Sequence, residues 1–163
     1  MKIAVLKPVF LPTGIKQVDD NLYRGNAVFS PLKALRLKKK GITQVVDLRA
    51  EDNILEKYLK KMEKFYLRIL GINYVNKKFD ITNFGRFPNI DFFEGLNEQI
   101  NKGDKTYIHC HFGKHRTSFV IAMLQKSLGI PDDVIIDNLK KIGWETEKRQ
   151  KLLNIFLQKF FKK

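Results

Sequence analysis

Four short runs of apolar and β-branched residues stand out along the chain, and runs of this kind favour buried strands. They cover residues 21–26, 42–50, 72–79 and 105–110. Each run is bounded by glycine, asparagine or charged residues, which are typical of turns and chain reversals. The pattern therefore predicts strands of modest length, separated by longer segments with a different period.

The intervening segments carry apolar residues at helical spacing. The clearest case begins at Ser30, a good N-cap residue, continues with Pro31 at the first helical position and ends before Gly41. Further helices are predicted over residues 52–70, 89–102, 116–128, 131–142 and 145–161. The segment 80–89 contains glycine, proline and two asparagines and is predicted to be a loop.

The helix over 52–70 has one predicted apolar stripe and one predicted basic row. The stripe consists of Leu55, Leu59, Met62, Tyr66 and Ile69. The basic row consists of Lys57, Lys60, Lys64 and Arg68. We expect the stripe to face the core and the basic row to face solvent.

Strands that alternate with helices predict an α/β fold, with a short, mostly parallel central sheet flanked by helices. We find no internal repeat or low-complexity linker, so we expect a single compact domain over residues 1–163. Residues 1–15 are expected to form an N-terminal extension, which can add an element at the sheet edge.

The composition narrows the possible functions. A single cysteine excludes an internal disulfide and favours a reducing, cytoplasmic location, and no apolar run is long enough to span a membrane. We expect a monomer. The formal net charge of +14 favours a polyanionic partner, although a lysine-rich surface without such a partner explains it equally well.

That one cysteine, Cys110, lies in the stretch YIHCHFGKHRTSFV, where a predicted strand ends and a helix begins. Backbone N–H groups of the turn and of the first helical turn have no intrahelical partners there, so they favour an anion. Gly113 permits a sharp turn, and Arg116 can grip two oxygens of a phosphate with its planar guanidinium. We therefore predict a phosphate-binding loop between strand and helix.

The same loop favours nucleophilic chemistry, because a helix N-terminus and nearby cations lower the pKa of a cysteine. A Cys110 thiolate beneath a bound phosphoryl group can attack phosphorus. Thr117, or Ser118 beside it, can donate a hydrogen bond to this thiolate, and His109 is expected to brace the loop backbone. The residues expected to surround the phosphate are His111, Phe112, Gly113, Lys114, His115 and Arg116.

The stretch HCHFGKHRTS resembles the His-Cys-x5-Arg-Ser/Thr signature of cysteine-based protein tyrosine and dual-specificity phosphatases. Its GKHRT part is especially similar to the plant and fungal atypical dual-specificity phosphatases, which include enzymes that act on inositol pyrophosphates. The segments VDDNLYRGN and GITQVVDLR extend the likeness to roughly residues 17 to 160. His111, Phe112 and Ser118 depart from the usual pattern, which affects the expected substrate more than the reaction.

The resemblance implies that an aspartate about thirty residues before the cysteine protonates the leaving group. Asp80 stands at that distance, at the start of the predicted loop 80–88, and the sequence does not show whether this loop closes on substrate. Asp91, in a helix start, is the alternative. Asp47 lies inside a predicted strand, where we expect it to pair with a neighbour. No metal or other cofactor is expected, because His109, His111 and His115 are too tightly spaced for a tetrahedral site.

Three functional hypotheses remain open. Lys114, His115 and His111, with Arg49 at the same predicted sheet edge, favour a phosphorylated inositol or a similar small polyanion. A phosphotyrosine or phosphothreonine protein is the alternative. RNA is disfavoured, since no aromatic platform for bases is evident. A basic nucleic-acid-binding or membrane-binding protein with a vestigial phosphate loop is a third hypothesis, although no nucleic-acid motif supports it.

Overall fold

The computed structural model describes residues 14–50, 53–78, 90–141 and 151. Within them the chain forms one five-stranded sheet with the order β1-β2-β5-β3-β4. The strands are β1 (Lys16–Asp19), β2 (Leu22–Asn26), β3 (Gln44–Asp47), β4 (Asn73–Asn76) and β5 (Thr106–Cys110). β1 is antiparallel to β2, and the other neighbours are parallel. The predicted α/β class is confirmed, although β1 was not predicted.

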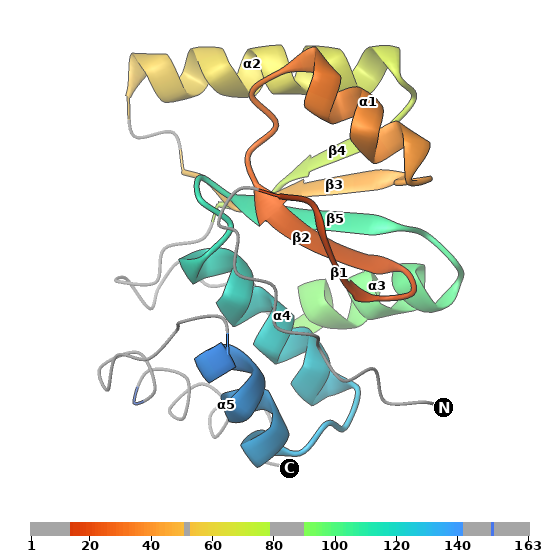
Figure 1. The fold of residues 1–163 in the computed structure, drawn as a ribbon, viewed down its shortest axis with the longest axis vertical. Coiled ribbons are helices and arrows are strands. Elements are labelled where there is room, and N and C mark those ends of the chain that lie inside the picture. Colours follow the sequence, from red (N-terminus) through yellow and green to blue (C-terminus); the bar gives the residue numbers. More distant parts are fainter. Residues whose placement is uncertain (1–13, 51–52, 79–89, 142–150, 152–163) are drawn as a thin grey trace.

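Helices cover both faces of the sheet (Figure 1). They are α1 (Pro31–Lys39), α2 (Ile54–Ile69), α3 (Ile90–Asn101), α4 (His115–Ser127) and α5 (Asp132–Lys141). α1 and α2 lie on one face, and α3, α4 and α5 lie on the other. The predicted loop 80–89, the predicted helix 145–161 and nearly all of the extension 1–15 lie outside the described residues. Among the helices that are described, none has the length and apolar character to cross a membrane.

The start and end of α1 are as predicted. The Ser30 side chain accepts a hydrogen bond from the Lys33 backbone N–H, Pro31 begins the helix, and Gly41 follows it with a left-handed φ of 76°. α2 has a cap that was not predicted, because Asn53 Oδ1 accepts a hydrogen bond from the Glu56 backbone at 2.8 Å. Local capping chemistry thus defines where both helices of this layer begin.

Side chains of the central strands alternate between two cores. Val46 and Ile108 belong to the core beneath α3, α4 and α5, whereas Val45 and Tyr107 belong to the core beneath α1 and α2. Because successive strand residues point to opposite faces, the last two residues of β5 must also separate. This alternation directs the side chains of His109 and Cys110 to different sides of the sheet.

The buried face of α2 differs from the prediction. Leu55 and Ile69, assigned to the core, are exposed, whereas Lys60, assigned to solvent, is buried together with Glu63. Lys60 Nζ donates to Arg49 O at 2.8 Å, so the polar end of β3 offers this lysine a partner that periodicity alone does not reveal. Of the remaining predicted stripe, Leu59, Met62 and Tyr66 are half-buried, and of the remaining basic row, Lys57, Lys64 and Arg68 are exposed as predicted.

Candidate active site

The predicted phosphate loop lies at the carboxyl end of β5, the middle strand of the sheet. Cys110 is the last residue of the strand and α4 begins at His115, so four residues form the connection. Open α/β sheets bind ligands beyond the carboxyl ends of their strands, where helix N-termini also gather. The described structure therefore brings the nucleophile candidate and a helix N-terminus to the same point.

Gly113 makes the tightest contact of the loop. Its φ is 67°, a left-handed value, and a Cβ there would lie 2.1 Å from the Gly25 carbonyl oxygen. Both conditions exclude a larger residue without rearrangement. The prediction that this glycine allows the sharp turn is confirmed, and the structure adds that the loop packs directly on β2.

Arg24 of β2 bonds to the phosphate loop and was not identified from the sequence. Its Nη2 donates to Gly113 O and to Ser118 Oγ, both at 2.7 Å, and the residue is buried. Burial lowers the pKa of Arg24 to about 10, while the negative charge of Cys110 acts in the opposite direction. An arginine in the middle of a buried strand was the available signal, because charged residues are rarely buried without a specific partner.

The Cys110 thiol is 5% exposed and favours its ionised form. Burial is the largest influence and acts to raise its pKa, but hydrogen bonding from the Thr117 side chain and from the Thr117 and Gly113 backbones lowers it. The positive charge of His109 acts in the same direction. The net result is a pKa below the ordinary value for a thiol, which increases the fraction of nucleophilic thiolate.

The two hydroxyl candidates beside the thiol differ in their partners. Ser118 Oγ donates to Lys114 O and accepts from Arg24, so this hydroxyl is committed to holding the loop. Thr117 Oγ1 is buried and, within the described residues, is committed to no group other than the neighbouring sulfur, whose pKa it lowers. Thr117 is therefore the hydroxyl available to the sulfur, while Ser118 supports the loop.

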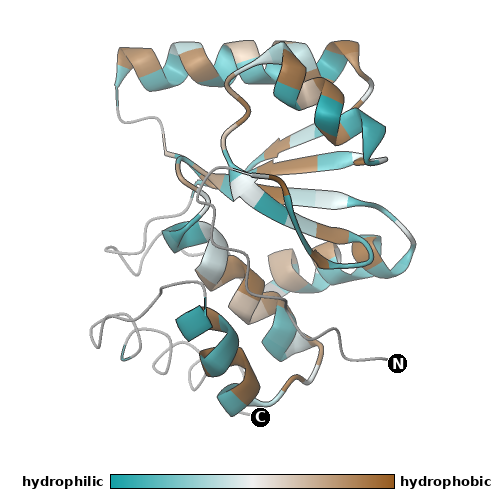
Figure 2. Cartoon of the chain, viewed as in Figure 1, coloured by the Kyte–Doolittle hydropathy of each residue, from teal (hydrophilic) through white to brown (hydrophobic). Residues whose placement is uncertain are grey.

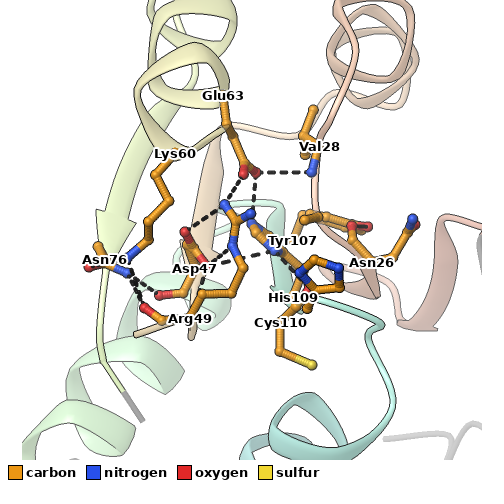
Figure 3. A network of polar contacts seen from close by, with 12 residues as sticks. Asn26, Val28, Asp47, Arg49, Lys60, Glu63, Asn76, Tyr107, His109 and Cys110 are labelled. Carbon is orange, nitrogen blue, oxygen red and sulfur yellow. Dashed lines mark hydrogen bonds and ion pairs between the residues drawn. The ribbon is translucent and has the colours of Figure 1, made fainter. Parts of the chain in front are cut away.

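His109 points to the opposite side of the sheet from Cys110, into a buried network with α2 (Figure 3). Its Nε2 lies 2.9 Å from Glu63 Oε1, and its Nδ1 lies 3.3 Å from the Cys110 carbonyl oxygen. Burial acts to lower the pKa of His109, but the nearby charges of Glu63 and Asp47 raise it above its ordinary value. These two carboxylates therefore favour the protonated form of His109, whose Nδ1 contacts the loop backbone as predicted.

Arg49 occupies the centre of the same network. Its Nε and Nη2 donate to the two carboxylate oxygens of Asp47, each at 2.9 Å, and Nη2 also contacts Glu63. Glu56 lies 3.5 Å from Nη1. The expectation that Arg49 adds positive charge to the phosphate pocket is wrong, because its guanidinium is 1% exposed and neutralised by carboxylates. Asp47 does pair with a neighbour, as predicted.

The carboxylates of Asp47 and Glu63 and the His109 ring bring three potential metal ligands within 4.8 Å of one another. These groups do not fit a metal site, because the Arg49 guanidinium already bonds to both carboxylates and supplies the cation. Tyr74 completes the shell by donating its hydroxyl to Asp47 at 2.6 Å. Burial and the negative charge of Asp47 raise the pKa of Tyr74, which therefore stays protonated as a donor.

The outer side of the loop is both aromatic and basic. His111 lies between the rings of Phe29 and Phe112, with centroid distances of 5.3 and 4.6 Å, and its Nδ1 is 3.7 Å from Glu56. Phe112 is 68% exposed. Lys114 is exposed, and His115 and Arg116 are half-buried at the start of α4. The mouth of the site therefore offers an aromatic surface beside cationic groups.

The structure leaves two candidates for the general acid. Asp80 and the loop 80–88 lie outside the described residues. Asp91 is exposed in the first turn of α3, where an acidic side chain also stabilises the helix N-terminus. Asp47 is fully buried and bonded to Arg49, so it is not available to a leaving group.

Several solved structures share this fold at low identity. The core catalytic domain of the PP-IP phosphatase SIW14 from S. cerevisiae is 18% identical, with a TM-score of 0.65 over 89% of this chain and 86% of its own. TpbA from P. aeruginosa is 14% identical, with a TM-score of 0.63 over 88% and 83%. Kinase-associated phosphatase is 23% identical, with a TM-score of 0.63 over 80% and 76%. Among curated protein sequences, none matches this chain.

The family comparison is more direct than these structural similarities. Residues 16–151, from the start of β1 to beyond α5, match the model of the tyrosine phosphatase family. The matched region includes the whole phosphate loop and the network behind it. Because the match covers most of the sequence, and its fold is that of the solved phosphatases, the chain belongs to the tyrosine phosphatase family and is a cysteine-based phosphatase.

Proposed function

We propose that this phosphatase works through a phosphocysteine intermediate on Cys110. The observation that carries the proposal is the position of the buried thiol between β5 and α4, with a lowered pKa. Hydrogen bonds from the loop and the charges of Arg24 and His109 stabilise negative charge at this point. A thiolate at a helix N-terminus suits attack on a bound phosphoryl group.

The proposed reaction has two displacements. Cys110 Sγ attacks phosphorus while the bond from phosphorus to the leaving oxygen breaks, and Asp80 gives that oxygen its proton. Water then attacks the phosphocysteine, Asp80 takes a proton from it, and the S–P bond breaks to release inorganic phosphate and the thiolate. Arg116 and the loop N–H groups stabilise the charge on the phosphoryl oxygens, and Thr117 donates to the departing sulfur. These groups supply the chemistry without a metal.

For the substrate, we favour a phosphorylated inositol. Lys114 is exposed, and His115 and Arg116 follow it at the start of α4, so several basic side chains lie together at the phosphate loop. The net charge of +14 and the structural likeness to a PP-IP phosphatase support the same class. The similarity of GKHRT to the plant and fungal atypical dual-specificity phosphatases agrees with this choice.

A phosphotyrosine or phosphothreonine protein is the second candidate, because of Phe112. This exposed ring packs edge-on against His111 at the mouth, where it can contact the ring of a phosphotyrosine. A variant of TpbA, which shares the fold, has been solved in complex with phosphotyrosine. The two hypotheses therefore assign recognition to different residues of one loop.

The test is kcat/KM on an aryl phosphate, phosphotyrosine and phosphothreonine peptides, inositol hexakisphosphate and an inositol pyrophosphate. Cys110→Ser should abolish turnover of every substrate, and Asp80→Asn should slow the esters more than the pyrophosphate, whose leaving group is better. If inositols are the substrates, Lys114→Ala should lower their kcat/KM by about tenfold, equivalent to about 1.4 kcal/mol, and Phe112→Ala should have little effect.

The opposite pattern, with Phe112→Ala selectively impairing the phosphotyrosine peptide, would favour a protein substrate. Equal inactivity of wild type and Cys110→Ser on the whole panel would contradict catalysis. In that case salt-sensitive binding of phosphorylated ligands by both proteins would indicate a vestigial, phosphate-binding loop.

A further inference from the structure

The outer surface of α1 and α2 exposes an unusual number of large apolar side chains. They are Leu32 and Leu35 of α1, and Ile54, Leu55, Tyr58, Phe65 and Ile69 of α2. Figure 2 shows hydrophobic and hydrophilic residues interleaved along both helices. Single exposed apolar residues are common, but a group on one helix layer marks a surface that another body covers.

On α2 four of the exposed apolar residues form a stripe, and Lys61 lies on the same side of the helix between them. Ile54, Tyr58, Phe65 and Ile69 are separated by four, seven and four residues, spacings that return to the same side of an α-helix. The opposite side of the helix is buried against the sheet through Glu63 and its neighbours. The stripe is therefore separate from the core-facing side and is presented outward.

Every exposed charge in this layer is positive. Within Pro31–Lys39 and Ile54–Ile69, both fully described, the exposed charged residues are Arg36, Lys38, Lys39, Lys57, Lys61, Lys64 and Arg68. The only two acids in these helices are Glu63, which is buried, and Glu56, which is only 16% exposed and paired with Arg49. No acidic side chain of α1 or α2 is therefore exposed to neutralise these cations at the surface.

We propose that the α1/α2 layer docks on the surface of an anionic lipid bilayer. Apolar and aromatic side chains of a surface helix enter the boundary between headgroups and acyl chains, while flanking lysines and arginines bind anionic headgroups. An uninterrupted set of cations is complementary to such a surface. An acidic protein groove would also need to fit two helices side by side, whereas a bilayer is a plane that contacts both.

This orientation places the active site at the side of the docked surface. α2 begins near the carboxyl ends of the parallel strands, where the phosphate loop also lies (Figure 1). Glu56, in the first turn of α2, lies 3.7 Å from His111 of the loop, so the two structures are in contact. The apolar stripe thus starts close to the phosphate loop.

Vesicle co-sedimentation of the whole chain tests the proposal. We expect binding to phosphatidylcholine vesicles that contain phosphatidylserine, weak binding to phosphatidylcholine alone, and weakening by salt. Lys61→Glu/Lys64→Glu should weaken binding to the anionic vesicles by at least about tenfold, since each lysine near such a surface contributes on the order of 1 kcal/mol. Phe65→Gln should weaken it at high salt, where the apolar contribution dominates.

Lys140→Glu/Lys141→Glu on α5, at the other face of the sheet, removes the same charge and should leave vesicle binding unchanged. All variants should keep wild-type activity on a soluble aryl phosphate, which shows that they are folded. The proposal fails if wild type does not bind anionic vesicles, or if the α5 variant loses as much binding as the α2 variant. A dimer in light scattering that Phe65→Gln dissociates would assign the face to a second copy of the chain and also overturn it.

Discussion

Replacing Glu63 with glutamine should destabilise the fold and change how its stability depends on pH. Glu63 is fully buried and contacts the charged groups of Arg49 and His109, and its Oε1 also accepts a hydrogen bond from the Val28 backbone at 3.2 Å. Glutamine keeps the shape and an acceptor oxygen, so the substitution mainly removes one negative charge from the network behind the phosphate loop.

The magnitude follows from the charge balance. The fully buried carboxylates of Asp47 and Glu63 face Arg49 and His109, and the half-buried Glu56 adds a third carboxylate 3.5 Å from Arg49. Glu63→Gln removes the carboxylate that lies nearest to His109, and breaking a buried pair by removing one partner costs about 3–5 kcal/mol. A loss of that size is a large part of the roughly 5–15 kcal/mol that stabilises a typical domain.

The sign of the pH dependence is set by His109, whose pKa is raised in the folded protein. A raised pKa contributes stability that is fully present below the unfolded value of about 6.5 and is lost as pH rises through the folded value, with a slope of at most about 1.4 kcal/mol per pH unit. In Glu63→Gln the group that raises this pKa most is absent. The stability difference between wild type and variant should therefore narrow as pH rises above about 6.5.

Urea unfolding between pH 6 and pH 8 measures this difference, because groups common to both proteins cancel. The experiment is best done in a Cys110→Ser background, where no thiolate titrates. Glu56→Gln is the matched control, since Glu56 lies on the same helix and pairs with Arg49, but it contacts His111 instead of the buried His109. We expect a smaller loss and a smaller narrowing for Glu56→Gln than for Glu63→Gln. A constant difference for Glu63→Gln would refute a charged His109 and leave Glu63 acting through Arg49 alone.

Three further predictions concern the loop itself. Gly113→Ala should lower the free energy of unfolding more than Gly129→Ala does. Both glycines have φ near 70°, but only at Gly113 would the new methyl group lie 2.1 Å from a backbone oxygen. Because the loop must then shift, Gly113→Ala should also lower kcat/KM by about a hundredfold. Thr117→Val removes a hydroxyl that donates to the charged sulfur, so it should slow turnover by about tenfold or more and raise the pKa of Cys110. The rate of iodoacetamide alkylation as a function of pH measures this pKa. Arg24→Met should also raise the pKa of Cys110, because it removes a nearby positive charge. It should destabilise the fold by about 1.5–3 kcal/mol for each of the two lost hydrogen bonds, which urea unfolding measures. An alkylation profile unchanged in Thr117→Val or Arg24→Met would show that the residue does not stabilise the thiolate.

The site residues that the structure brings together as expected are local in sequence. Cys110, Gly113 and Thr117 lie within eight residues of one another, and a strand–turn–helix pattern is enough to bring them together. The helix over Pro31–Lys39 was also predictable, because its cap and its terminating glycine are next to it in the chain. Local chemistry of this kind does not depend on which distant segments pack nearby.

The parts that were missed depend on distant contacts. Arg24 reaches a partner 89 positions away in Gly113, and Glu63 accepts from a backbone N–H 35 positions away. For α2, periodicity identified the helix and three half-buried residues of its stripe, but it wrongly assigned Leu55 and Ile69 to the core. The buried side of α2 is the side that carries Glu63, the partner of Arg49 just after the end of β3.

The two buried arginines of the site differ in a way that bears on the nucleophile. Arg49 contacts three carboxylates, whereas the hydrogen bonds of Arg24 among the described residues go to a carbonyl and a hydroxyl. The nearby charge that favours protonated Arg24 most is the ionised Cys110, so a neutral thiol would leave this cation buried without a counter-charge. A phosphocysteine would carry negative charge at the same point, and Arg24 would then remain compensated before, during and after phosphoryl transfer. Arg24 therefore acts on the site in two ways, because its hydrogen bonds hold the loop and its charge favours the ionised sulfur.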